Sequence, residues 1–179
     1  MQHNFVLTPV STGKIFCSTY TTFQEKGLLP TTPLPRDHPF WNLWKDHLVS
    51  LIYPGNSDTA IDALVALERG DPDWKDTASP DDILVRQRDM RAILSHNPPD
   101  VILLSGMNDY GFHRRQERFW PFICINEDYV DLWMDAKDGT KRCFGLVALL
   151  RASIDHELGH WVQTLVSTTS CHSSWLTFM

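Results

Sequence analysis

The chain has 179 residues, of which 42% are hydrophobic, and a formal net charge of −6. A chain of this length can bury its own core, and its composition is typical of one folded domain rather than of a disordered segment. The acidic charge argues against general binding of nucleic acid, because no basic stripe is available to match phosphates. The densest basic segment, residues 113–118, is mixed with acid and is interpreted as a solvated face.

Residues 1–36 are rich in Thr, Ser and Pro, which predicts an extended N-terminal arm. The first ten residues lack the charged start and apolar stretch of a secretory signal, and no run elsewhere is long and apolar enough to span a bilayer. We therefore expect a cytoplasmic protein without a membrane partner, unless a leader has been removed. The cysteines are widely separated and show no C-x-x-C pattern, so free buried thiols are expected at Cys17, Cys124, Cys143 and Cys171.

Helical spacing of apolar residues predicts three helices before residue 97, at 40–52, 57–70 and 80–96. Asp37 is the expected N-cap of the first helix. Ser79 is a strong start for the third helix, because Pro follows it at the first helical position and acidic residues fill the first turn. The intervening segment 70–78 lacks the pattern of a calcium-binding loop and is interpreted as a solvated turn.

Short apolar runs rich in branched residues predict two strands, Val101–Leu104 and Phe122–Ile125. Residues 129–133 fit either a short helix or a third strand. A further apolar run from Phe144 to Ile154 predicts a largely buried helix, which continues through Trp161 and Val162. The order of several helices, two or three strands and a last helix indicates an α+β fold, with a small sheet packed on that helix in a single domain over residues 37–179.

The last helix carries the sequence His156-Glu157-Leu158-Gly159-His160, an H-E-x-x-H motif. Residues four apart on a helix project from one face, so the two imidazoles can chelate one zinc ion while Glu157 holds a water molecule. Gly159 weakens a helix and indicates the close approach of another segment or of a substrate strand. The alternative interpretation is a helix whose histidines are only hydrogen-bonded.

Residues 153–162 resemble the active-site helix of the zincin metallopeptidases, and the strand at 122–126 resembles the zincin strand along which an extended substrate pairs. The resemblance implies a zincin-like α+β catalytic domain with Zn²⁺ as cofactor. It also implies that His156 and His160 are zinc ligands and that Glu157 is the general base acting on a zinc-bound water. The donor that would hold the oxyanion stays open among three residues: Tyr110, Tyr129 and His113.

The third zinc ligand does not follow from a known zincin pattern. The metzincin extension would need Gly and His where this chain has Gln163 and Val166, and no Asp or Glu follows Glu157. We therefore assign the third ligand to His172, which would fold back to the metal after a Ser/Thr-rich turn. A surface position in the tail is the alternative for His172. Upstream residues also stay open as the third ligand: His113, Glu127, Asp128, Asp131 and Cys143.

These features together predict a zinc-dependent hydrolase, best interpreted as a metallopeptidase that acts on a peptide or protein substrate. Two other functions stay open. One is a non-peptidase zinc enzyme that acts on a small molecule, since it would need the same metal, water and base. The other is a catalytically inactive binding protein that retains a zincin fold.

Overall fold

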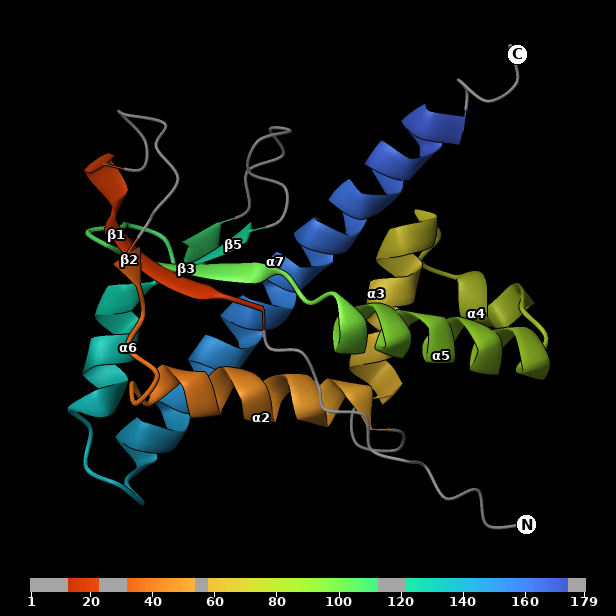
Figure 1. Ribbon diagram of the computed structural model, residues 1–179. Coiled ribbons are helices and arrows are strands. Elements are labelled where there is room, and N and C mark those ends of the chain that lie inside the picture. The colour runs from red at the N-terminus through yellow and green to blue at the C-terminus, as the bar shows by residue number, and fades with distance from the viewer. Residues whose placement is uncertain (1–12, 23–31, 54–57, 113–121, 174–179) are drawn as a thin grey trace.

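A small mixed sheet with helices packed on one face forms the core of the fold, which is α+β as the sequence predicts (Figure 1). The computed structural model describes residues 13–22, 32–53, 58–112 and 122–173, with the backbone alone at Phe112 and at 166–173. None of the helices within these ranges is long and apolar enough to cross a membrane.

Five strands make up the sheet, in the order β2-β1-β3-β5-β4. Their bounds are β1 Ile15–Thr19, β2 Thr32–Pro33, β3 Asp100–Ser105, β4 Gly111–Phe112 and β5 Phe122–Asn126. The three central strands run parallel, with Val101 of β3 paired with Ile15 on one side and Ile123 on the other. The short edge strands β2 and β4 are antiparallel to their neighbours. The strands expected at 101–104 and 122–125 are thus confirmed as β3 and β5.

The predicted N-terminal arm is in part an interior portion of the sheet. Strand β1 lies between β2 and β3, and Ile15 is 1% exposed in the core. Leu34 is also buried, and its amide donates a hydrogen bond to the carbonyl of Ile15. A domain boundary at residue 36 therefore does not separate these residues from the domain. The Ser/Thr-rich composition concealed a strand too short to show a clear alternation of apolar residues.

The three helices predicted before residue 97 are confirmed as α2 Phe40–Ile52, α3 Asp58–Arg69 and α5 Pro80–His96. Ser79 caps α5, since its side chain accepts a hydrogen bond from the amide of Asp82. The expected cap of α2 is wrong: Pro39 occupies the N-cap position, without a side-chain cap. The turn expected at 70–78 contains a short helix, α4 Trp74–Thr77, because the Trp74 indole is 2% exposed and anchors the segment in the core.

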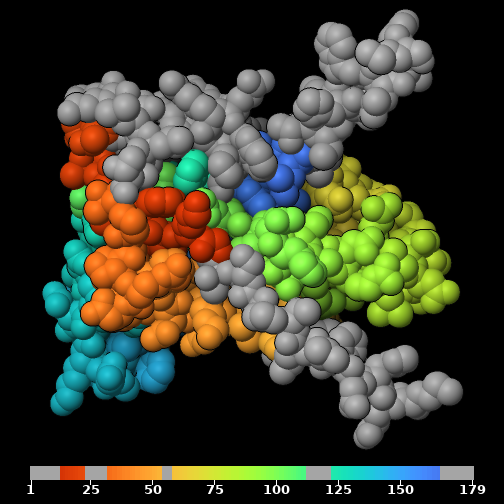
Figure 2. Space-filling view, viewed as in Figure 1, coloured from red at the N-terminus to blue at the C-terminus, as the bar shows by residue number. Residues whose placement is uncertain are grey.

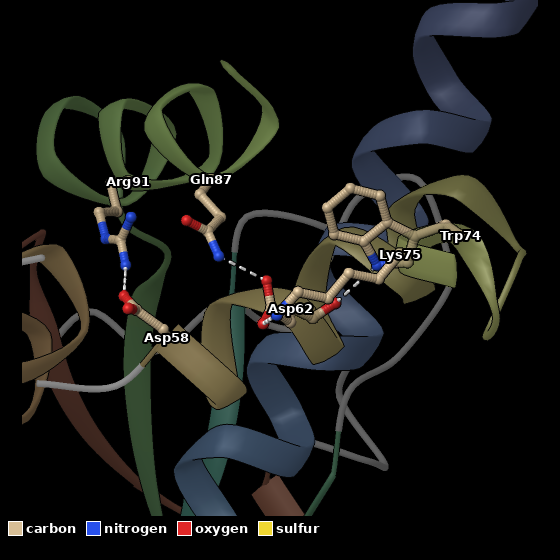
Figure 3. A network of polar contacts seen from close by, with 6 residues as sticks. All are labelled: Asp58, Asp62, Trp74, Lys75, Gln87 and Arg91. Carbon is tan, nitrogen blue, oxygen red and sulfur yellow. Dashed lines mark hydrogen bonds and ion pairs between the residues drawn. The ribbon is translucent and has the colours of Figure 1, made fainter. Parts of the chain in front are cut away.

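Polar contacts join α3 to α4 and α5 (Figure 3). Asp62 of α3 accepts from Gln87 at 2.7 Å, and its backbone carbonyl accepts from the Trp74 indole at 3.3 Å. Asp58, one helical turn earlier, pairs with Arg91 of α5. Because Gln87 and Arg91 are themselves buried, these bonds satisfy the Gln87 amide nitrogen and one terminal guanidinium nitrogen of Arg91, whereas Nε of Arg91 has no partner among the described residues.

Two helices follow the sheet, α6 Glu127–Met134 and α7 Lys141–Ser173. The ambiguous segment 129–133 is thus helical, and Asn126 caps α6 by accepting from the amide of Asp128. In Figures 1 and 2, α6 lies at the left of the molecule and α3, α4 and α5 at the right, while α2 runs along the lower side and contacts α3 and α5. Helix α7 crosses the molecule diagonally and packs its apolar face against the core. The residues of that face are Leu150, Ile154, Leu158, Trp161 and Val162.

Candidate metal centre

The H-E-x-x-H motif lies in the middle of α7, at the margin of its buried face. Glu157 and Leu158 are buried, whereas His156 is exposed and His160 is partly exposed. A helix rotates 100° for each residue, so neighbouring positions differ sharply in their access to solvent. The glutamate therefore faces the sheet while both histidines reach the surface.

The two imidazoles converge as the four-residue spacing predicts. Their Nε2 atoms lie 3.1 Å apart, and the rings are nearly perpendicular. Two imidazole nitrogens bound to one tetrahedral zinc ion at the usual bond length lie about 3.3 Å apart. The separation of the pair is thus close to that of two adjacent zinc ligands. The same separation also permits a hydrogen bond between two neutral rings.

Glu157 is buried without a hydrogen-bond partner on one of its oxygens. The residue is 2% exposed, and its Oε2 atom accepts no hydrogen bond within the described part of the chain. Burial raises the pKa of Glu157 from its ordinary 4.5 to about 7. An unsatisfied buried carboxylate is costly, and such groups are concentrated at functional sites.

Glu157 lies against the edge strand β4. A Cβ atom placed on Gly111 would stand 3.1 Å from Cγ and 3.2 Å from Oε1 of Glu157. Gly111 pairs with Ile125, whose side chain is in the core between the sheet and the helices. The carboxylate therefore lies beneath the end of the sheet, between α7 and β4. Sequence analysis missed this contact because a strand of two residues shows no periodicity.

Asp155, which directly precedes the motif, binds α2. Its Oδ1 atom accepts a hydrogen bond from Nε2 of His47 at 2.8 Å. His47 is 4% exposed, and its Nδ1 atom has no partner among the described residues. The pair fixes α7 relative to α2, one residue before His156.

Gly159 is explained by the packing of α7 against α3. A Cβ atom at this position would lie 2.7 Å from Cδ1 of Leu67. The close approach inferred from the sequence is therefore made by a side chain of a neighbouring helix, rather than by a backbone segment or a substrate strand.

The structure does not bring His172 to the histidine pair. The turn expected before it is absent, because α7 continues to Ser173. Twelve residues of continuous helix separate His172 from His160 by about 18 Å along the axis. Cys143 lies thirteen residues before His156 on the same helix, which is about 20 Å. The assignment of His172 as a ligand thus gains no support from the backbone.

The other upstream candidates do not complete a metal site either. Glu127 is at the start of α6, where burial and then the charges of Asp131 and Asp128 raise its pKa. His113 lies outside the described residues. Within the described ranges, no group of three His, Cys, Asp or Glu residues could hold a metal ion. The structure thus brings His156 and His160 together, with Glu157 between them in the chain but turned toward the sheet, and the third ligand stays unassigned.

The strand expected to receive a substrate is an interior one. β5 pairs with β3 on one side and with β4 on the other, so its hydrogen-bonding edges are occupied along the paired residues. The edge next to α7 belongs to β4. Tyr110, one of the candidate oxyanion donors, directly precedes β4 and packs against Tyr129 with ring centroids 4.8 Å apart. Partial burial and the neighbouring Tyr110 raise the pKa of Tyr129.

Comparisons with models of protein families, with curated proteins and with solved structures found no match. The function is therefore argued from the residues and their geometry.

Proposed function

We propose that this protein is a zinc-dependent hydrolase, and specifically a metallopeptidase. The observation that carries the proposal is the convergence of two imidazole Nε2 atoms at 3.1 Å beside the buried, incompletely paired carboxylate of Glu157. A helix whose histidines serve only its stability gives no reason for an uncompensated carboxylate next to them.

His156 and His160 would hold the ion from one face of α7. Zinc, when bound, supplies Lewis acidity toward a carbonyl and lowers the pKa of a water ligand. Glu157 accepts the proton of the attacking water at its free Oε2 atom and then delivers it to the leaving amine. The low exposure of Glu157 keeps bulk water from competing for that proton.

An extended peptide is the substrate class that best suits the neighbouring sheet. Among the described strands β4 is the last of the sheet, and none of them pairs with its outer edge, so a further strand can add there. A peptide that adds to this edge by backbone hydrogen bonds would pass directly beside Gly111, beneath which Glu157 lies. This arrangement favours a peptide over a small molecule.

Zinc content is the first test. We expect about one zinc per chain by elemental analysis of the purified protein. His156→Ala and His160→Ala should lose it, whereas His96→Ala, which removes an exposed histidine on α5, should retain it. His172→Ala tests the assignment made from the sequence. If the wild type holds no zinc after reconstitution, the proposal of a zinc enzyme is refuted, and a binding protein that retains the motif is the remaining interpretation.

Hydrolysis is the second test. A library of unstructured peptides should be cleaved by the zinc-loaded wild type and by Glu68→Gln, a control on α3. Glu157→Gln should retain zinc and lose at least about 100-fold in kcat, because it lacks the proton acceptor. Bound zinc with hydrolysis of small amides but not of peptides would instead indicate the non-peptidase enzyme.

A further inference from the structure

The contact between β4 and α7 depends on the absence of a side chain at Gly111. A Cβ atom there would stand 2.8 Å from the carbonyl oxygen of Cys124, in addition to its close contacts with Cγ and Oε1 of Glu157. Neither neighbour can move freely. Cys124 is held in β5 by its pairing with Ile102 of β3, and Glu157 is held in a buried position on α7.

The backbone conformation does not explain this glycine. The described glycines with positive φ are Gly13, Gly70, Gly106 and Gly139, and Gly111 is not among them. Gly111 lies in a regular antiparallel pairing, where glycine weakens a strand relative to other residues. What distinguishes the position is the lack of space, since a strand glycine marks the close approach of another group.

The carboxylate of Glu157 is held by packing rather than by a full set of hydrogen bonds. Its Oε2 atom has no partner within the described ranges, so hydrogen bonding does not fix that oxygen. Its Cγ and Oε1 atoms approach the β4 backbone at the point where Gly111 has no Cβ. The strand backbone therefore forms one wall of the space in which the carboxylate lies.

We infer that Gly111 is a positioning residue for Glu157. Because residue 111 has no side chain, β4 approaches the carboxylate closely and so determines where the carboxylate lies relative to the histidine pair. The inference rests on the proposed role of Glu157 as general base. A methyl group at residue 111 must either move the carboxylate or lift β4 from β5. Displacements of this kind reduce catalysis strongly, because proton transfer needs close alignment of donor and acceptor.

A double-mutant cycle tests the contact between Gly111 and Glu157 independently of enzymatic activity. Its readout is the midpoint of thermal unfolding of the zinc-free protein. Gly111→Ala should lower the midpoint of thermal unfolding by roughly 3 °C or more. In a Glu157→Ala background the same substitution should cost clearly less, because the contacts with Cγ and Oε1 are then gone and only the contact with the Cys124 carbonyl remains. If Gly111→Ala folds in neither background, the contact with the Cys124 carbonyl alone accounts for the glycine, and the inference is overturned. Equal losses in both backgrounds would overturn the inference.

Kinetics of the zinc-loaded protein test the consequence for Glu157. Gly111→Ala should retain zinc and lose at least about tenfold in kcat. Gly145→Ala, a glycine of α7 with open space around its Cβ position, is the matched control and should retain both zinc and kcat. Full kcat in Gly111→Ala would refute the positioning role. A wild type without zinc or hydrolysis would refute the proposed function, while the unfolding cycle would still decide whether the contact exists.

Discussion

The stability of the zinc-free protein should depend on pH through Glu157. Burial raises its pKa from 4.5 to about 7, so the folded state binds this proton more tightly than the unfolded chain does. The stabilisation from this group is therefore fully present below about pH 4.5 and is lost as pH rises through about 7. Above that range, the folded state carries an ionised carboxylate in a poorly solvated position.

The difference between the two pKa values corresponds to roughly 3 kcal/mol in the free energy of unfolding. Glu157→Gln removes the titration while it keeps the size of the side chain. The free energy of unfolding of the variant, measured relative to that of the wild type, should therefore increase by up to roughly 3 kcal/mol between pH 4.5 and pH 8. The constant cost of burying an amide cancels in this comparison across pH.

Urea unfolding of the chelator-treated protein at intervals from pH 4 to pH 8 measures this difference. Titrations of groups remote from Glu157 are common to both proteins and cancel, whereas groups beside it, such as His156 and His160, can differ. Glu68→Gln on α3 should instead follow the wild type at all pH values. If the curves for the wild type and Glu157→Gln remain parallel across the range, burial does not penalise the carboxylate, and the reasoning about an uncompensated charge beside the histidines is refuted.

Substitutions at three further positions test the packing around the motif and the capping of α5, each by the free energy of urea unfolding. Gly159→Ala should change the free energy of unfolding by less than about 1 kcal/mol. The higher helix propensity of alanine offsets the displacement of Leu67, whose flexible side chain is 39% exposed. A loss above about 2 kcal/mol would show that Leu67 cannot move. Asp155→Ala should cost about 1–2 kcal/mol, since buried His47 loses its hydrogen bond; an unchanged midpoint would contradict this. Ser79→Ala should cost about 1 kcal/mol as the loss of an N-cap, and Ser79→Asp should restore it.

Features that depend on local sequence were predictable. Ser79 and the Pro that follows it specify the start of α5, and the four-residue spacing of His156 and His160 brings their imidazoles together on any regular helix. The runs at β3 and β5 are apolar because these strands are buried on both faces.

Features that depend on neighbours distant in the chain were not predictable from the sequence. The segment that forms β1 is too short to reveal a strand, and it becomes one only because β3 lies beside it. The role of Gly111 depends on Glu157, which lies far along the chain. The turn expected before His172 was inferred from Ser and Thr residues, yet these residues are compatible with a helix that is already long.

The interior position of β1 in the sheet also constrains the order in which the protein folds. Lys14 and Asp100, whose hydrogen bond marks the start of the β1–β3 pairing, are 86 residues apart in the chain. During synthesis β1 and its edge partner β2 leave the ribosome first, but the other partner, β3, emerges only after α2 to α5 have been made. Because closure of so long a loop is slow, the sheet is completed late in folding, after local helices have formed. Until then, the edge of β1 that pairs with β3 stays open to other chains, and unpaired strand edges favour misassembly.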